Sequence, residues 1–296
     1  MSRQVIVRPP AKVNLTLRVG ALGPDGRHAV QTLIQSISLS DTLTVSPRSG
    51  PFALSVRAPG VPADESNLVW RAAATLWKRS GRTGAPRDAH VRLEKAIPTQ
   101  AGLGGGSADA AAALVALNVV WGLQQTPRHL AAAAAELGSD VPFFLQGGTA
   151  VGIGRGDEIY PVDDIARFGV VVVKPSFGVS TREAYGWLDE DRAAGVEPSA
   201  GPAQEIDVGW PTGPVRLAND LQATVARRHP GVAEMVEACR REGALAAGMT
   251  GSGSAVFGLF RETTAKIAAG RLRRPDWLVL LGRTLTRREA ARKVGL

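Results

Sequence analysis

The 296-residue sequence predicts an α+β protein organised in two halves. Segments in which apolar and polar residues alternate dominate the first third of the chain, as half-buried strands require. Apolar residues at helical spacing follow in the middle of the chain. The composition, with 44% hydrophobic and 21% charged residues, is that of a globular protein. A chain of this length is expected to bury about three quarters of its unfolded surface without disulfides. We place the domains at 1–160 and 161–296, because the pattern changes near residues 155–170.

The first half is expected to consist of short strands joined by turns and followed by helices. Alternating or apolar runs predict strands at residues 5–7, 13–19, 29–38, 43–45, 52–56 and 91–94. The sequence Gly-Pro-Asp-Gly at 23–26 predicts a turn. Helical spacing predicts helices at 67–80, 107–121 and 127–137. For the second of these helices we expect Ser107 as the N-cap and Asp109 in the first turn, and for the third a stop at Gly138.

The second half is expected to contain a buried strand, a long connection and further helices. An apolar run predicts a strand at 170–173, and a segment rich in Gly, Pro, Asp and Glu predicts a surface connection at 186–214. Helices are expected at 215–228 and 232–242, before a glycine-serine turn and a short strand at 251–258. No repeat with a period of ~20–50 residues is visible, so a solenoid or propeller is excluded.

The net charge of +8 raises the question of nucleic-acid binding. Only six of the 35 basic residues are lysines, and together with the alanine runs this arginine bias is as typical of a genome-wide preference as of a selected binding face. The densest basic stretches, 271–274 and 283–293, contain no interleaved aromatic residues, so a base-stacking platform is not indicated. A positive field around an anionic substrate fits the charge equally well. We therefore expect a small-molecule partner and no nucleic acid.

Neither export nor a membrane is indicated by the sequence. The first residues have too short an apolar run for a secretory signal, and the best apolar candidate, 110–120, falls short of the ~18–20 residues of a membrane span. The single cysteine, Cys239, cannot form an internal disulfide, and the four histidines lack metal-ligand spacing. We expect a cytoplasmic protein with no membrane partner, no metal-binding side chains and a structural thiol.

The most informative segment is a glycine-rich loop expected between a strand and a helix. Glycines permit positive φ angles and let backbone N–H groups approach a ligand, and the following helix adds the positive end of its dipole. The loop is not a Walker loop, because no lysine precedes Ser107, and its spacing does not match G-x-G-x-x-G. A plain capping turn is the alternative, but four glycines within five positions favour a phosphate site. The residues expected to bind phosphate are Pro98, Thr99, Gln100, Ala101, Gly102, Leu103, Gly104, Gly105, Gly106, Ser107 and Ala108.

Three further segments have two interpretations each. Asp140, in Gly-Ser-Asp-Val-Pro, is by itself typical of a helix N-cap, but could act as a base toward a hydroxyl or as a magnesium ligand. Lys12 and Asn14 lie two apart on an expected strand and therefore project from one face, which by itself favours a solvent-facing edge. The glycine-serine segment 248–257 could offer ligand donors or form a tight bend, and the sequence favours neither.

Together these segments resemble the three motifs of the GHMP kinase superfamily, which are an N-terminal lysine strand, a glycine-serine phosphate loop and a late Gly-Ser-Gly turn. Their order and spacing match across nearly the whole chain. The resemblance implies ATP-dependent phosphorylation of a small molecule, with Mg²⁺. It also implies a two-domain fold with a ribosomal-protein-S5-like N-terminal half and a ferredoxin-like C-terminal half.

More narrowly, the segments Ala-Lys-Val-Asn-Leu at 11–15 and Asp-Val-Pro-Phe-Phe at 140–144 resemble one branch of this superfamily. That branch phosphorylates the tertiary 2-hydroxyl of a methylerythritol unit carried on cytidine diphosphate, in the non-mevalonate route to isoprenoids. The resemblance implies that Asp140 is the catalytic base and that Lys12 orients it and stabilises developing charge. It further assigns adenine to Asn67 and Lys95, cytosine to His28 and Tyr185, the methylerythritol end to Asn14, and additional substrate contacts to Gly251 and Ser252.

Two positions depart from the pattern of this branch. Arg27 stands where tyrosine is usual, which removes an aromatic ring near the cytosine, although arginine can also stack on a base or meet a phosphate. Gln100 replaces a usual glycine, which we expect to stiffen the entry of the loop. Both changes bear on affinity rather than on the class of reaction.

Three alternative functions are weighed against this one. A GHMP kinase for homoserine or a mevalonate derivative is the nearest, and the context of Asp140 argues against it. A nucleotide-binding regulator without turnover would not need both Lys12 and Asp140. An arginine-driven nucleic-acid binder would show salt-sensitive binding to any duplex. We expect a monomer or weak homodimer, and the sequence leaves open whether residues 186–214 form a mobile lid over substrate.

Overall fold

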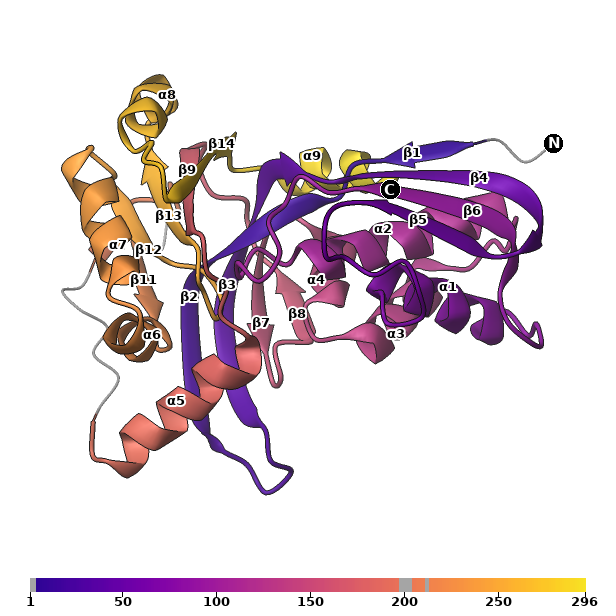
Figure 1. Cartoon of the computed structure of the whole chain (residues 1–296), viewed down its shortest axis with the longest axis horizontal. Coiled ribbons are helices and arrows are strands. Elements are labelled where there is room, and N and C mark those ends of the chain that lie inside the picture. The colour runs from indigo at the N-terminus through magenta and orange to yellow at the C-terminus, as the bar shows by residue number, and fades with distance from the viewer. Residues whose placement is uncertain (1–3, 197–203, 211–212) are drawn as a thin grey trace.

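The computed structural model describes residues 4–196, 204–210 and 213–296 (Figure 1). These residues form three β-sheets with helices on their outer faces, so the predicted α+β class is confirmed. None of the helices in the described ranges is long and apolar enough to cross a membrane. The same ranges hold no group of three or more His, Cys, Asp or Glu side chains placed to bind a metal ion.

The first sheet, in the order β1–β4–β6–β5, carries the N-terminal layer of helices on the right of Figure 1. Its strands are β1 (Val5–Val7), β4 (Thr42–Pro51), β5 (Ala53–Arg57) and β6 (Arg87–Glu94). The helices of this layer are α1 (Leu68–Arg79), α2 (Gly105–Val120), α3 (Pro127–Leu137) and α4 (Val141–Gln146). The core lies between them, in a buried cluster that includes Val45 and Leu93 of the sheet and Leu114 of α2. The alanine-rich body of α2 is buried almost throughout, which lets neighbouring helices approach closely.

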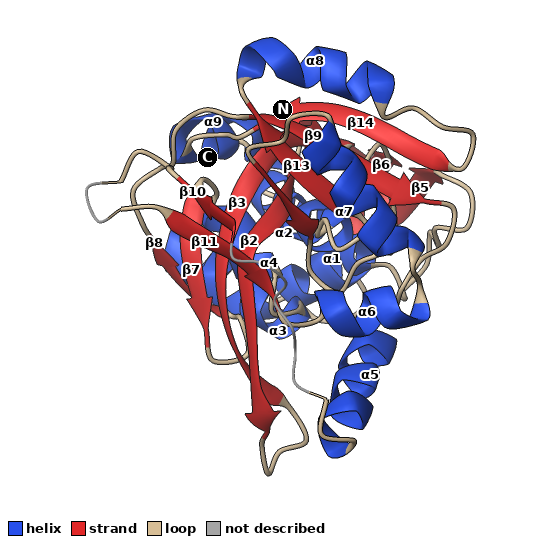
Figure 2. Ribbon diagram, turned by 90° about the vertical axis from the view of Figure 1, so that its left-hand side faces the viewer, coloured by secondary structure: helices blue, strands red, loops and turns tan. Residues whose placement is uncertain are grey.

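The central sheet, in the order β10–β11–β2–β3–β7–β8, joins the two halves of the chain. Its strands are β2 (Pro10–Leu22), β3 (His28–Ser40), β7 (Thr149–Ile153), β8 (Glu158–Pro161), β10 (Gln204–Ile206) and β11 (Val215–Asn219). Strands β2 and β3 form a long antiparallel hairpin that runs through the middle of the molecule (Figures 1 and 2). Strand β11 pairs parallel to β2, with Ala218 opposite Thr16, so the second half extends a sheet begun by the first.

The third sheet, in the order β12–β13–β9–β14, packs on the central sheet. Its strands are β9 (Gly169–Pro175), β12 (Ala246–Met249), β13 (Val256–Phe260) and β14 (Trp277–Arg283). The apolar run of β9 is buried on both faces: Val172 packs toward Val13 of β2, and Val173 toward Met235 in the outer layer. The remaining helices are α5 (Thr181–Ala193), α6 (Gln222–Arg228), α7 (Gly231–Arg241), α8 (Glu262–Arg271) and α9 (Arg287–Val294).

Two expectations for the second half are wrong. The helix expected at 215–228 is strand β11 followed by the short helix α6, because Val215 and Leu217 alternate with the exposed Arg216 along a strand that pairs with β2. The surface connection expected at 186–214 begins inside helix α5, which starts in a capping box of Ser180 and Glu183 and ends at Ala193. Residues 197–203 and 211–212 of that expected connection lie outside the described residues.

The expected start of helix α2 is also wrong. Gly104 is its N-cap, with a φ of +70°, and the helix begins at Gly105, which places Ser107 inside the first turn and Asp109 beyond it. The other two predicted helices of this half are confirmed. Helix α1 is capped by Asn67, whose side chain accepts a hydrogen bond from Val69 N, and α3 ends at its C-cap Gly138.

Candidate active site

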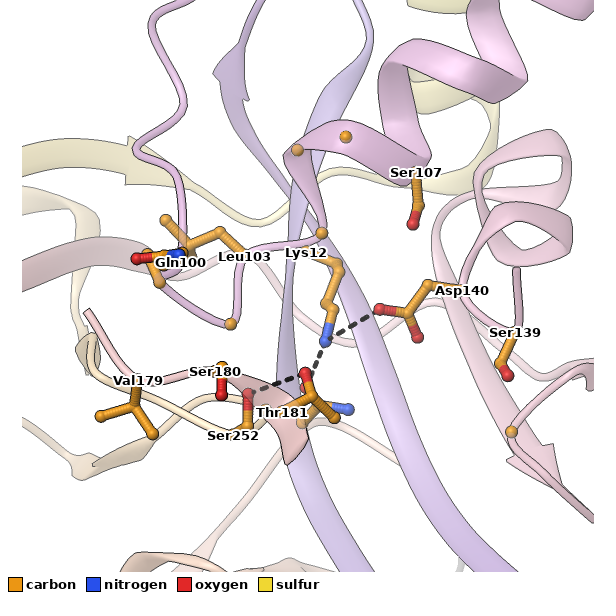
Figure 3. Close-up of a pocket in the computed structure, with 18 of the residues that line it drawn as sticks. Lys12, Gln100, Leu103, Ser107, Ser139, Asp140, Val179, Ser180, Thr181 and Ser252 are labelled. Carbon is orange, nitrogen blue, oxygen red and sulfur yellow. Dashed lines mark hydrogen bonds and ion pairs between the residues drawn. The ribbon is translucent and has the colours of Figure 1, made fainter. Parts of the chain in front are cut away.

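A cavity of about 680 Å³ opens between the glycine loop and the second half of the chain (Figure 3). It brings together most of the residues singled out in the sequence. From the first half come Lys12, Asn14, Lys95, residues 98–107 and Asp140, and from the second half Tyr185, Gly251 and Ser252. Asn67, Ala108 and His28 were expected at the site but are not among the residues that line this cavity.

The glycine loop is held in place by backbone contacts on both sides. Lys12 N donates to Leu103 O at 3.0 Å, which fixes the loop against strand β2. Gly102 and Gly104 have φ values of +71° and +70°, in the left-handed region that favours glycine. A Cβ atom at Gly102 would lie 2.0 Å from Thr250 O, and one at Gly104 would lie 2.6 Å from Cζ of Phe144. The loop therefore requires glycine at these two positions for its own fold.

Helix α2 begins at the end of this loop without a side-chain cap. The first N–H groups of a helix have no partner inside the helix, and they carry the positive end of its dipole. Gly105 and Gly106 line the cavity at this helix start, so backbone donors face it without an intervening side chain. Such an arrangement of backbone donors is suited to holding a phosphate group. Gln100, at the loop entry, has a φ of +50°, a conformation that a glycine would adopt at lower cost.

Lys12 and Asp140 face one another across the cavity (Figure 3). Lys12 Nζ donates to Asn14 Oδ1 at 2.6 Å and lies 3.6 Å from Asp140 Oδ2. The expectation of a solvent-facing edge is wrong, because β2 is an inner strand of its sheet and Lys12 is only 3% exposed. Asn14 is fixed in turn by its own donation to Thr32 Oγ1 at 2.7 Å. The ammonium group is thus buried, hydrogen-bonded and aimed at a carboxylate.

Asp140 occupies the N-cap position of α4 but does not act as a cap. Its side chain makes no hydrogen bond to the start of the helix, and it is 40% exposed toward the cavity. Pro142 lies near the helix start, where a missing N–H has no cost. The carboxylate is therefore available to a ligand, which the N-cap interpretation of this motif did not anticipate.

The glycine-serine turn of the second half packs directly on the glycine loop. Thr250 Oγ1 donates to Gly102 O at 3.1 Å and accepts from Asn14 N at 3.1 Å. Ser252 Oγ lies 3.3 Å from Thr181 Oγ1, and both residues line the cavity (Figure 3). This turn therefore packs two loops together and also presents hydroxyl groups to the cavity, so both interpretations of the segment apply.

Lys95 belongs to a buried ion cluster beneath the start of α2. Its Nζ contacts Asp41 Oδ2 and lies 2.7 Å from Asp109 Oδ2. Asp41 also accepts from the backbone N–H groups of Ala96 and Ile97, whereas Asp109 Oδ1 is buried without a hydrogen-bond partner. Burial raises the pKa of Asp109 well above its usual range. Burial acts to lower the pKa of Lys95, but the two carboxyl groups outweigh it and raise that pKa.

Both polar atoms of the Asn67 side chain are hydrogen-bonded to the protein backbone and do not serve the cavity. Its Oδ1 accepts from Val69 N at 2.9 Å and its Nδ2 donates to Pro62 O at 2.7 Å. The next residue, Leu68, lines the cavity. The amide of Asn67 therefore anchors the helix whose Leu68 lines the cavity, and Asn67 itself is not among the lining residues.

Tyr185 and His28 lie side by side at the other end of the cavity. Their ring centroids are 5.3 Å apart, and Tyr185 lines the cavity directly. Burial, with a smaller contribution from the Asp140 carboxylate, raises the pKa of Tyr185 to about 12, so its hydroxyl group stays protonated at neutral pH. His28 and Arg27 line an adjoining cavity of about 350 Å³. Arg155 lines both cavities and connects them.

Several residues that line the main cavity were not anticipated from the sequence. Ser180 and Thr181 lie at the start of helix α5, and the Ser-x-x-Glu pattern that begins there was a readable helix-start signal. Arg155 lies in a Gly-Arg-Gly turn between β7 and β8, and no local pattern distinguishes it from other arginines. Ser139 precedes Asp140 and is part of the same motif.

The chain matches family models along much of its length. Residues 67–148 match the N-terminal domain of the GHMP kinases, and residues 208–275 match the GHMP kinase C-terminal domain. Solved structures of a homoserine kinase from Cytophaga hutchinsonii (17% identity, TM-score 0.66, covering 97% of this chain and 96% of that one) and of a mevalonate kinase (13%, 0.66, 95% and 99%) share the fold. The chain is a member of the GHMP kinases and has their two-domain α+β fold.

Relatives with higher sequence identity show to which family of GHMP kinases the chain belongs. The 4-diphosphocytidyl-2-C-methyl-D-erythritol kinase of Pelotomaculum thermopropionicum is 43% identical over 286 residues, which cover 94% of this chain and 97% of that protein. The enzyme of the same name from Rhodococcus jostii is 42% identical, over 90% of this chain and 86% of its own length. A crystal structure of a 4-(cytidine 5'-diphospho)-2C-methyl-D-erythritol kinase has 33% identity and a TM-score of 0.73, and covers 95% of this chain and 99% of that one. The chain belongs to the 4-diphosphocytidyl-2-C-methyl-D-erythritol kinase family.

Proposed function

We propose that this chain transfers the γ-phosphoryl group of ATP to the 2-hydroxyl of 4-diphosphocytidyl-2-C-methyl-D-erythritol. The observation that carries the proposal is the pair of Lys12 and Asp140, 3.6 Å apart, in a cavity bordered by the glycine loop. The names of relatives that are 42–43% identical over most of the chain support this substrate. The reaction then belongs to the non-mevalonate route to isoprenoids.

The glycine loop holds the triphosphate of ATP in this proposal. Backbone N–H groups at the start of α2 meet the phosphate oxygens, and the absence of side chains at Gly105 and Gly106 lets them approach. Ser107 adds a hydroxyl group from the first turn. Lys95 and Leu68, which also line the cavity, border the nucleoside end.

Asp140 and Lys12 act on the hydroxyl group that is phosphorylated. Phosphoryl transfer has a loose transition state, so positioning and charge neutralisation contribute more than a strong base does. The Asp140 carboxylate, uncommitted to its helix, accepts the hydroxyl proton as the bond to phosphorus forms. The buried ammonium of Lys12 orients that carboxylate and stabilises negative charge on the transferring group.

The cytidine end of the substrate lies toward Tyr185 in this proposal. The phenol ring offers a flat apolar face next to His28. Arg155, which borders both cavities, supplies positive charge for the diphosphate. Arg27, in the adjoining cavity, provides a second cationic group.

Magnesium is proposed to enter with the nucleotide. Within the described lining of the cavity, Asp140 is the single acidic side chain and Ser107 is the hydroxyl at the phosphate cradle. A hard cation that keeps several waters and binds mainly through substrate phosphates fits so small a set of oxygen ligands. When bound, Mg²⁺ would neutralise charge on the phosphate groups.

An assay of ADP release tests this function. The protein is incubated with ATP, Mg²⁺ and one acceptor at a time: the cytidine substrate, homoserine or mevalonate. We expect ADP release with the cytidine substrate and only background with the other two. A preference for homoserine or mevalonate would contradict the proposal, and ATP binding without turnover of any acceptor would favour a nucleotide-binding regulator.

A further inference from the structure

Helix α5 presents three side chains to the β2–β3 hairpin. Tyr185, Asp189 and Arg192 are spaced i, i+4 and i+7, so they lie along one face of the helix. Each contacts a residue of the hairpin near its turn: Tyr185 and Asp189 meet His28, and Arg192 meets Gly20. Figure 2 shows the helix beside the end of the hairpin that lies farthest from the third sheet.

Asp189 fixes the ring of His28. His28 Nε2 lies 3.3 Å from Asp189 Oδ2, and His28 Nδ1 lies 3.0 Å from Gly20 O. A carboxylate and a carbonyl group only accept hydrogen bonds, so each of these bonds needs a proton on the ring nitrogen that makes it. The His28 side chain is 6% exposed, so the ring has one orientation, between Asp189 and the hairpin backbone.

Arg192 connects helix α5 to the backbone of the β2–β3 hairpin. Its guanidinium group donates to Gly20 O at 2.8 Å and to Val19 O at 2.5 Å. Gly20 O therefore accepts from both His28 and Arg192. A fork of two parallel donors sets the distance and the angle between helix and strand, which a single hydrogen bond would not do.

The opposite side of α5 is anchored separately. Asp191 is mostly buried and accepts from Arg227 and Arg228 of helix α6. Glu190 pairs with Arg228 at 2.8 Å, toward solvent. The polar contacts that Asp189 and Arg192 make with the hairpin are therefore separate from those that α5 makes with α6. Removing the charge of Glu190 leaves the contacts with the hairpin intact.

We propose that Asp189 and Arg192 are positioning residues for the cytidine end of the substrate. They act through His28 and Tyr185, by fixing the β2–β3 hairpin against α5 so that these two rings keep their separation of 5.3 Å. This inference rests on the proposed function, because that function places the cytidine between the hairpin and Tyr185. Neither side chain lines the main cavity, so neither needs to touch the ligand.

The substitution Asp189→Asn tests the contact, since it keeps the shape of the side chain and removes its charge. We expect the apparent KM for the cytidine substrate to rise roughly 3- to 10-fold, as loss of a partly exposed hydrogen bond would produce. The kcat and the KM for ATP should stay as in the wild type. Arg192→Met should act in the same direction, and Arg192→Lys should recover part of the loss. Glu190→Gln is the matched control and should change none of these constants.

A double-mutant cycle shows whether Asp189 acts through His28. In a His28→Asn background, Asp189→Asn should raise the KM no further. Independent effects of the two substitutions, an unchanged KM in Asp189→Asn, or equal rises in both KM values would overturn the inference.

A binding titration separates this inference from the proposed function. The dissociation constant of cytidine 5'-diphosphate, measured by calorimetry, should rise in Asp189→Asn and not in Glu190→Gln. If the wild type releases no ADP with the cytidine substrate, the proposed function fails. The titration then still decides the inference, which an unchanged dissociation constant in Asp189→Asn would refute.

Discussion

The buried ion cluster beneath the glycine loop leads to a specific prediction about where a proton is held. The side chains of Lys95, Asp41 and Asp109 are 7%, 0% and 3% exposed, so one ammonium group shares a dry site with two carboxyl groups. A net negative charge there would be costly to bury. Asp41 accepts two backbone hydrogen bonds as well as that of Lys95, while Asp109 Oδ1 has no partner. The cluster is neutral if Asp109 carries the proton, which the rise in its pKa on burial favours.

The substitution Asp109→Asn should therefore be nearly neutral for folding. An amide keeps the oxygen that accepts from Lys95 and replaces the protonated oxygen by a group of the same shape. In Asp41→Asn, by contrast, the amide oxygen stays with the two backbone donors and the NH₂ group is turned toward the ammonium of Lys95. Breaking a buried pair in this way costs ~3–5 kcal/mol, which lowers the melting temperature of a chain of this size by roughly 6–20 °C. Asp109→Asn should stay within about 1 kcal/mol of the wild type, or ~2–4 °C.

The pH dependence of the stability also tests whether Asp109 holds the proton. Because folding raises the pKa of Asp109 above the ordinary value of 3.8, the folded state favours the protonated form. The stabilisation is full below the ordinary pKa and is lost as pH rises through the pKa of the folded state. Asp109→Asn lacks this dependence. The melting temperature of the variant relative to that of the wild type should therefore rise from acid to neutral pH. A variant as unstable as Asp41→Asn, or a difference that does not change with pH, would refute the assignment of the proton.

Three further predictions concern the cavity itself. Asp140→Asn should keep the dissociation constant for ATP and lower kcat by ~10²–10⁴, the usual contribution of a general base; normal turnover by the folded variant would remove Asp140 from this role. A Cβ atom at Gly104 would lie 2.6 Å from Phe144, whereas one at Gly106 has its nearest neighbour at 3.5 Å. Gly104→Ala should therefore weaken ATP binding and cost ~1–2 kcal/mol of strain, and Gly106→Ala should keep the wild-type melting temperature; equal melting temperatures would contradict the loop geometry. Tyr185→Ala should raise the KM for the cytidine substrate ~5- to 150-fold at near-constant kcat, the effect of losing one base-stacking contact, and a lower melting temperature with an unchanged KM would show that the ring only packs the fold.

Features with a local signal could be predicted from the sequence. The two-residue spacing of Lys12 and Asn14 placed them on one face of a strand, and their side chains are hydrogen-bonded to each other at 2.6 Å. The extents of helices α1 and α3, and the stop of α3 at Gly138, depend on neighbouring residues and could be predicted for the same reason. The glycine loop was recognisable because a strand, a run of glycines and an apolar helix follow one another between residues 91 and 121.

Features that depend on distant parts of the chain could not be predicted. Lys12 is buried because the glycine loop, some ninety residues later, packs against β2 and Lys12 N donates to Leu103 O, and no local pattern records this contact. Strand β11 was itself mistaken for helix, since five residues carry too short an alternation to outweigh the helical pattern that follows. The contact of Thr250 with Gly102 spans 148 residues, so the docking of the two loops was equally invisible. The division of the chain at residue 160 stays a prediction.

The most direct test of the proposed reaction is the position of the new phosphate group in the product. The protein is incubated with ATP, Mg²⁺ and the cytidine substrate, and the product is examined by ³¹P and ¹³C nuclear magnetic resonance. We predict a phosphomonoester signal that couples to the quaternary carbon C2, because Asp140 and Lys12 are proposed to act on the tertiary hydroxyl group. Coupling to a carbon that bears hydrogen, or inorganic phosphate in place of a phosphomonoester, would contradict it.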